Sequence, residues 1–206
     1  MSVPEKVDVY FDYACPFADS AARWAAELKK QIGDEVQFNF KFFPLEQVNA
    51  PVDVEETVWT LPRENRSPAR HSMQAGAAAL QQGSEAFDAF NLELMKLKHS
   101  EGQDHGKRAT IIEAAQRAGL NLTQFEEDLE DDDLLDIVRE HYEAGVTEHG
   151  VFGTPTFVFP SGVAIYLQVL PAPTAEEAVP LWREFVATAV ERPNYREFKR
   201  ARRPAR

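Results

Sequence analysis

Apolar and polar residues alternate in two segments near the start of the chain, which is the pattern of half-buried β-strands. Residues 7–11 and 35–43 show this alternation and contain many β-branched or aromatic side chains, so we expect a strand in each. Between them, residues 16–31 carry an apolar stripe at helical spacing, and Pro16 suits the first position of a helix. Strand, helix and strand in this order predict a βαβ unit with parallel strands.

Helical periodicity dominates the middle of the chain, after an irregular segment at 45–67 that contains several prolines. The pattern predicts helices over 69–82, 84–98, 108–118 and 133–149. Gly119 is the expected C-cap of the third helix, and Thr123 is the expected N-cap of a short extra helix that ends at Leu129. These helices interrupt a pattern that is otherwise α/β.

The chain then returns to strands and ends on a helix. Residues 156–159 and 163–169 are predicted to pair as antiparallel strands around a tight turn at 160–162. Thr174 and Glu177 have the spacing of a capping box, which predicts the start of a last helix over 175–190.

The order of elements predicts an α/β, thioredoxin-like fold with a mixed four-stranded sheet, helices on both faces and a helical insertion. We therefore divide the chain into a discontinuous sheet domain, a helical insertion and a basic C-terminal tail. Their expected ranges are 1–62 with 140–192 for the sheet domain, 63–139 for the insertion and 193–206 for the tail.

Composition excludes several classes of protein. The net charge of −12 argues against a general nucleic-acid-binding protein, because phosphate backbones need a basic surface. No apolar run reaches the ~20 residues that span a bilayer, and the N-terminus lacks a signal-peptide pattern, so we expect a cytoplasmic protein without membrane contact. The acidic stretch 126–136 is expected to be a solvated helix face or a helix start, and the alternative is contact with a partner or a neighbouring subunit. The five histidines lack the spacing of metal ligands, so no metal site is expected.

The only cysteine, Cys15, lies between the first predicted strand and the first predicted helix. A helix start offers unpaired N–H groups and the positive end of the helix dipole, and both favour the thiolate, the form that attacks. As the expected N-cap, Cys15 would accept hydrogen bonds from the N–H groups of Phe17 and Ala18. Cys15 is therefore the candidate nucleophile.

Two motifs and the helices between them resemble the DsbA family of the thioredoxin superfamily. Residues 11–18 read F-D-Y-A-C-P-F-A, similar to the family's F-D-x-x-C-P-x-C, and 143–157 contain E-A followed by G-V-F-G-T-P-T-F. The resemblance implies a cis peptide bond before Pro155, beside the active cysteine. It also implies that the backbone of Thr154, after Gly153, pairs with a bound peptide or glutathione-like thiol. From the residues alone, this segment is either a constrained turn or a plain strand start.

The resemblance also implies an active-site motif around Cys15, made of Tyr13, Pro16, Phe17 and Ala18. Ala18 departs from the family pattern, because dithiol members carry at that position the second cysteine that resolves a mixed disulfide. Alanine leaves a route through one thiol, with an external thiol as resolving agent. The other explanation of Ala18 is a substitution introduced to trap an intermediate.

Three functions remain open. The first is a monothiol thiol-disulfide oxidoreductase that acts on protein or small-molecule disulfides, without a tightly bound cofactor and with glutathione or another small thiol as co-substrate. The second is a glutathione-dependent transferase or isomerase, since the related kappa-class glutathione transferases and 2-hydroxychromene-2-carboxylate isomerases have a serine where Cys15 lies. The third is a non-catalytic binding module. Family resemblance also suggests a homodimer.

Overall fold

The sheet has four strands in the order β2-β1-β3-β4, so β1 is bonded on both sides. The computed structural model describes residues 5–51, 56–192 and 194. The strands are β1 (Glu5–Phe11), β2 (Val36–Phe42), β3 (Thr156–Val158) and β4 (Ala164–Tyr166). β1 runs parallel to β2 and antiparallel to β3, and β3 runs antiparallel to β4. The predicted mixed sheet is confirmed, although β4 is shorter than expected.

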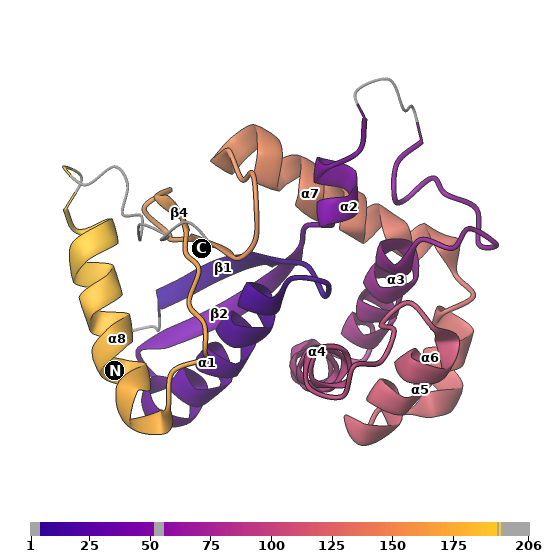
Figure 1. Cartoon of the computed structure of the whole chain (residues 1–206), viewed down its shortest axis with the longest axis horizontal. Coiled ribbons are helices and arrows are strands. Elements are labelled where there is room, and N and C mark those ends of the chain that lie inside the picture. The colour runs from indigo at the N-terminus through magenta and orange to yellow at the C-terminus, as the bar shows by residue number, and fades with distance from the viewer. Residues whose placement is uncertain (1–4, 52–55, 193, 195–206) are drawn as a thin grey trace, which may run out of the picture.

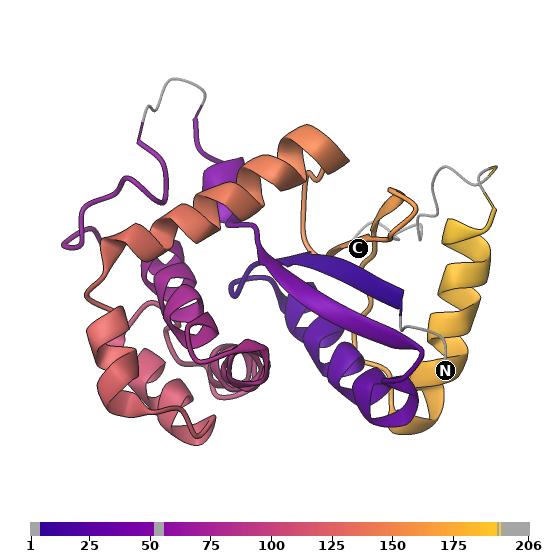
Figure 2. The same cartoon turned by 180° about the vertical axis from the view of Figure 1, so that it is seen from behind.

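Helices cover both faces of the sheet (Figures 1 and 2). α1 (Pro16–Ile32) and α8 (Ala175–Phe185) contact each other and share one apolar core with β1. Trp24 of α1 is buried in that core, and its indole N–H donates to the carbonyl of Ala178 at 2.9 Å. The two helices are therefore joined by one buried hydrogen bond as well as by packing.

The predicted helical insertion lies beside the sheet, and its colour in Figure 1 changes along the chain from purple through magenta to orange. Its helices are α3 (Pro68–Leu80), α4 (Ser84–His99), α5 (Arg108–Arg117), α6 (Leu122–Asp128) and, after a 3₁₀ turn at Asp132–Leu134, α7 (Leu135–His149). α7 leads back to the sheet and packs against β2 on the face opposite to α1. The ring of Tyr10 contacts α7 at Gly145, where a Cβ would lie 2.7 Å from the ring.

Several helix ends differ from the prediction. α6 begins two residues earlier, because the side chain of Asn121, not Thr123, accepts the N–H of Gln124 at 3.3 Å. A short helix, α2 (Leu45–Val48), lies in the segment expected to be irregular. α8 ends at Phe185 and continues as a π-helical turn at Val186–Val190, where backbone bonds span five residues. The basic tail predicted at 193–206 lies outside the described residues, apart from Asn194.

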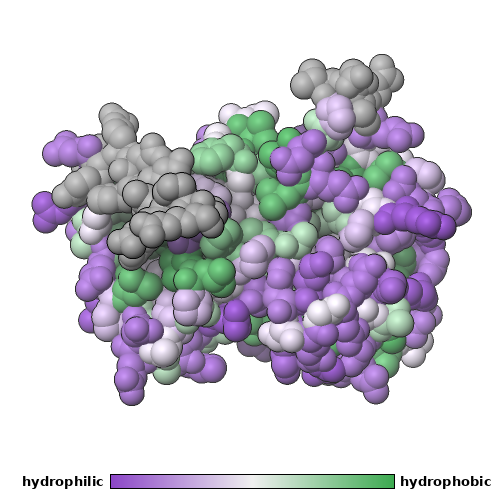
Figure 3. Space-filling model, viewed as in Figure 1, coloured by the Kyte–Doolittle hydropathy of each residue, from purple (hydrophilic) through white to green (hydrophobic). Residues whose placement is uncertain are grey.

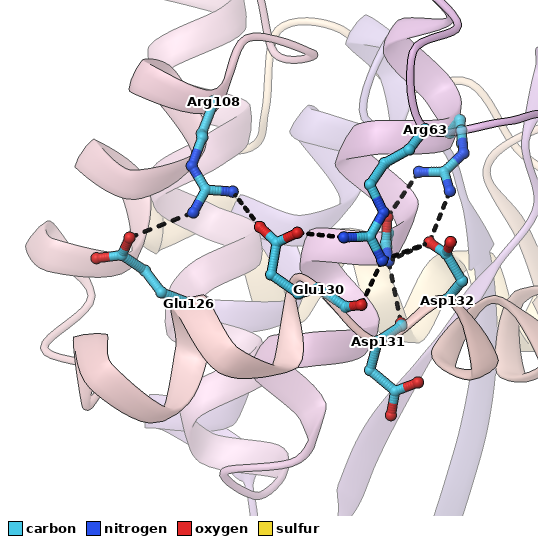
Figure 4. A network of polar contacts seen from close by, with 8 residues as sticks. Arg63, Arg108, Glu126, Glu130, Asp131 and Asp132 are labelled. Atoms are coloured by element: carbon cyan, nitrogen blue, oxygen red, sulfur yellow. Dashed lines mark hydrogen bonds and ion pairs between the residues drawn. The ribbon is translucent and has the colours of Figure 1, made fainter.

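Arginines tie the segment between α2 and α3 to the insertion (Figure 4). Arg70 is 1% exposed, donates to the carbonyl of Leu61 at 2.7 Å and pairs with Asp132 at 2.7 Å. Arg63 pairs with Glu130 and Asp132. The acidic stretch was expected to be a solvated face or a helix start, but these carboxylates also serve as partners of arginines, because the chain between the helices folds back over them.

No helix among the described residues is long and apolar enough to cross a membrane. The longest, α1, has lysines and glutamate on its outer face.

His141 of α7 makes stability depend on pH. Its Nδ1 accepts the backbone N–H of Phe42 at 3.3 Å, its ring stacks on Phe42, and burial lowers the pKa of the imidazole to about 4. Between about pH 4 and pH 6.5, the ordinary pKa of histidine, the unfolded chain binds more protons than the folded protein. The contribution of His141 to stability is therefore fully present above pH 6.5 and is lost as the pH falls to about 4.

We therefore expect His141→Gln to lower the free energy of unfolding by about 1–3 kcal/mol at pH 7 and by much less at pH 4. Urea denaturation of both proteins from pH 4 to pH 8 measures this difference. His149→Gln, at the end of the same helix, is the matched control. A difference that stays constant with pH would contradict the assignment.

Candidate functional site

Cys15 is the N-cap of α1 and lies opposite the loop that precedes β3. Its backbone is extended (φ −85°, ψ 117°), and Pro16 occupies the first position of the helix. The thiol donates to the carbonyl oxygen of Thr154, with 3.4 Å between Sγ and the oxygen and 139 residues between them in the chain. Cys15 is 6% exposed. The structure thus brings together the candidate nucleophile and the loop that carries the second motif.

The expected capping role of the Cys15 side chain is wrong. The sulfur accepts no hydrogen bond from the start of the helix. The N–H of Ala18 bonds instead to the backbone carbonyl of Cys15 at 3.1 Å. The physical reason is the direction of the thiol, which turns across to Thr154 rather than along the helix. The helix dipole still acts at this position, because it depends on the backbone.

The loop opposite Cys15 is held by its own hydrogen bonds. The bond between Thr154 and Pro155 is cis, as the family resemblance implied. The hydroxyl of Thr156 donates to the carbonyl of Gly153 at 2.7 Å, and the N–H of Leu167 donates to the carbonyl of Pro155 at 3.2 Å. Gly153 also leaves room for a ring, because a Cβ there would lie 3.2 Å from Tyr166. The carbonyl of Thr154 is consequently fixed toward the thiol.

The rest of the predicted motif divides into exposed and buried positions. Pro16 is exposed at the mouth of the site, and Phe17 is half-buried against the core. Ala18 is fully buried one turn into the helix, within the same core cluster as Cys15. No second thiol stands beside Cys15, since it is the only cysteine of the chain. Any mixed disulfide on Cys15 needs a thiol from outside.

Tyr13 points away from the site mouth and into the helical insertion. It is fully buried, its hydroxyl donates to the side-chain oxygen of Asn91, and its ring packs edge-on against Phe11 at 5.0 Å. The buried position of Tyr13 requires a glycine at residue 76 of α3. A Cβ on Gly76 would overlap the Tyr13 hydroxyl and lie 2.7 Å from the ring of Phe42. Tyr13 therefore anchors the turn before Cys15, and its hydroxyl is not available to a substrate.

Asp12 supports the turn before Cys15 with both oxygens of its side chain. It is 2% exposed, and its two carboxylate oxygens accept the N–H groups of Ala14 and Leu45, each at 2.6 Å. Burial raises the pKa of this carboxyl to about 6, against the effect of these two bonds and of Lys98. An aspartate three residues before the cysteine was visible in the sequence, but its second partner is 33 residues away.

Two histidines that sequence reasoning left aside lie on the insertion side of the site. The Nε2 of His99, at the end of α4, is 2.9 Å from the carbonyl oxygen of Tyr13. His105 is 5% exposed, and burial, helped by the charges of Lys98 and His99, lowers its pKa to about 4. The turn that carries Cys15 is therefore bordered by the imidazole of His99.

Aromatic and aliphatic side chains are exposed on the other side of Cys15. Phe152 is 68% exposed and its ring lies 5.1 Å from that of Tyr166, which is 38% exposed. Burial, and after it the charge that Cys15 can carry, raise the pKa of Tyr166 above its ordinary value. Figure 3 shows apolar surface gathered between the sheet half and the helical half, whereas the helical half is mainly polar.

The described residues contain no cluster of three or more histidines, cysteines or carboxylates that could hold a metal ion. What the site offers is one thiol, a fixed backbone carbonyl beside it, and apolar surface next to both. These parts suit chemistry at sulfur.

The chain belongs to the family of DSBA-like thioredoxin domains, whose model matches residues 6–172. It is 27% identical over 200 residues to the uncharacterized protein Rv2286c of Mycobacterium tuberculosis, covering 97% of this chain and 83% of that protein. This family membership agrees with the predicted fold and with both motifs.

Two solved structures illustrate the range of proteins that share the fold. A 2-hydroxychromene-2-carboxylate isomerase superimposes with a TM-score of 0.63 at 17% identity, over 88% of this chain and 95% of the other. MdbA, a thiol-disulfide oxidoreductase from Actinomyces oris, superimposes with a TM-score of 0.58 at 18% identity, over 87% and 80%. Identities this low show the shared fold and do not decide between the two activities.

The buried position of Tyr13 predicts that its hydroxyl supports stability rather than chemistry. Tyr13→Phe leaves the side chain of Asn91 without its donor, so we expect a loss of about 1–3 kcal/mol in the free energy of unfolding. The alkylation rate of Cys15 by iodoacetamide should stay within about twofold. Urea denaturation and alkylation kinetics measure the two effects, with Tyr142→Phe in α7 as control. A large fall in alkylation rate with unchanged stability would contradict this role.

Proposed function

We propose that this protein is a thiol-disulfide oxidoreductase that works through the single thiol of Cys15. The observation that carries the proposal is the position of Sγ at the start of α1, 3.4 Å from the carbonyl of Thr154 beside the cis proline. The helix start favours a negative sulfur. The family resemblance implies that the backbone before the cis proline pairs with a bound chain, and we assign that role to Thr154, which is 2% exposed in the absence of a substrate.

The proposed reaction has two exchange steps. The Cys15 thiolate, after its proton passes to solvent, attacks one sulfur of a disulfide, forms a mixed disulfide and releases the other sulfur as a thiolate, which then takes up a proton. A small external thiolate next attacks the mixed disulfide at the partner sulfur, the one that came from the substrate. Attack at the partner sulfur frees Cys15 and yields a new disulfide, so one disulfide is consumed and one formed in each cycle.

Because residue 18 is alanine, resolution of the mixed disulfide is intermolecular in the proposed reaction. In a dithiol enzyme, a cysteine one turn along the helix would perform it, and alanine cannot. Glutathione or another low-molecular-weight thiol is the co-substrate that we propose, together with a protein or small-molecule disulfide as substrate. A reducing, cytoplasmic setting supplies such thiols and agrees with a chain that contains a single cysteine.

A second candidate is a glutathione-dependent isomerase or transferase. The similarity to the 2-hydroxychromene-2-carboxylate isomerase favours it, and so does the low exposure of Cys15, 6%, which suits a residue that orients the sulfur of a bound thiol. Under this alternative a hydroxyl replaces the thiol without loss of function. A non-catalytic binding module, whether monomer or homodimer, is the third candidate, and it needs no reactive sulfur.

The experiment that tests the proposal is exposure of the reduced protein to oxidised glutathione, followed by intact mass and by a disulfide-reduction assay with glutathione as reductant. We expect a mass increase of one glutathione on the wild-type protein, release of the adduct by added thiol, and no turnover in Cys15→Ser. A second assay, conjugation of glutathione to a model electrophile, addresses the other candidates. Absence of any adduct together with conjugation that survives in Cys15→Ser would support the isomerase or transferase, and absence of both adduct and conjugation would leave the binding module.

Restoring a second thiol should change how the mixed disulfide is resolved. In Ala18→Cys, the new cysteine is three residues from Cys15, at the family's own spacing, so we expect it to displace the bound glutathione and leave an intramolecular disulfide. The adduct should then fall below about a tenth of the wild-type amount. Ala18→Ser is the matched control, because it adds a similar side chain without a thiol and should keep the adduct. Equal adduct in both variants would contradict intermolecular resolution.

A further inference from the structure

The turn that carries Cys15 is held in place by one buried carboxylate, that of Asp12. Asp12 accepts the N–H of Ala14 with one oxygen and the N–H of Leu45 with the other, both at 2.6 Å. Its backbone carbonyl also accepts the N–H of Cys15 at 3.1 Å. One residue thus fixes the turn, the cysteine's own backbone and the start of α2.

These two side-chain bonds require an ionised carboxylate. An ionised carboxylate is an acceptor at both oxygens, whereas a protonated one presents an O–H donor on one of them. A donor facing a backbone N–H loses that hydrogen bond, and at a buried site the N–H has no water to replace it. Protonation of Asp12 therefore removes one of the two bonds that join the turn to α2.

The groups around Asp12 make its protonation accessible near neutral pH. Burial opposes the charge, as does Glu46 of α2, while the two N–H bonds and Lys98 of α4 favour it, and the result is a pKa of about 6. Tyr13 of the same turn is also electrostatically coupled to Asp12, but burial keeps its phenol protonated by raising its pKa well above the ordinary value. The Nε2 of His99, in α4, lies 2.9 Å from the carbonyl oxygen of Tyr13 and is a further titratable group beside this turn.

Both oxygens of Asp12 are occupied by backbone donors, and the thiol of Cys15 is directed to Thr154. Asp12 is thus placed to act on Cys15 through the backbone rather than by taking its proton. We propose that Asp12 is a positioning residue whose ionised carboxylate holds the thiol of Cys15 against the Thr154 loop, and whose protonation loosens the turn. This inference rests on the proposed function, because positioning of the thiol affects a reaction only if Cys15 is the reacting group.

The test combines a structural titration with a reaction rate. Backbone ¹H–¹⁵N spectra of the wild-type protein from pH 4.5 to pH 8 should show the amide signals of Ala14, Cys15 and Leu45 shifting together with a midpoint near 6. The rate of reaction of Cys15 with oxidised glutathione, divided by the thiolate fraction, should fall below the same midpoint. Asp12→Asn should abolish the shared midpoint and lower that rate by about tenfold at pH 7.5.

Asp8→Asn is the matched control, since Asp8 lies on β1, the strand that leads to Asp12, but its carboxylate accepts a hydrogen bond from the exposed Asn39. It should preserve the midpoint and the rate. The wild-type titration needs no variant, so the proposal stays testable if Asp12→Asn does not fold. Three amides that titrate separately, or not at all, would overturn the proposal, and so would an unchanged rate in a folded Asp12→Asn protein.

The outcome separates this inference from the proposed function. If wild-type Cys15 forms no glutathione adduct at any pH, the proposed function fails and the positioning role fails with it, even where the amides share a midpoint. If the adduct forms normally but the amides do not titrate together, the proposed function stands and only the role of Asp12 is wrong.

Discussion

Strand β1 is hydrogen-bonded along both edges, and the location of the site depends on this pairing. Its parallel partner β2 is reached through α1, which must begin where β1 ends, so Cys15 stands at the carboxyl end of the strand. Its antiparallel partner β3 has Thr156 opposite Tyr10, so the start of β3 meets that same end. The thiol and the Thr154 carbonyl are neighbours because two pairings of opposite direction share one strand.

The helical insertion is part of the same folded unit as the turn before Cys15. Phe11 and Tyr13 belong to one apolar cluster with residues of α3 and α4, including Phe87 and Phe90. Because this core is continuous, loss of packing in the insertion would also release the turn. The site is consequently fixed from three sides: by the sheet, by the insertion through Tyr13, and by α2 through Asp12.

Buried titratable groups around the sheet act on stability in opposite directions. The raised pKa of Asp12 means that the folded state binds a proton more tightly, so its contribution to stability falls as the pH rises from about 4 to about 6. The lowered pKa values of His105 and His141, about 4 each, give contributions that grow as the pH rises from about 4 to about 6.5. These effects partly offset each other in mildly acidic solution.

The sequence by itself determined the order of the main elements, though not α2, and it singled out a candidate site at Cys15. Alternation marked β1 and β2, the capping box at Thr174 and Glu177 marked the start of α8, and one cysteine beside a proline marked the nucleophile. These signals are local, since each depends on residues a few positions apart. Only the tertiary structure decided that the thiol faces Thr154, that Tyr13 is enclosed by the insertion, and that Asp12 reaches Leu45. Such contacts join residues from 33 to 139 positions apart, and a single sequence carries no local pattern for them.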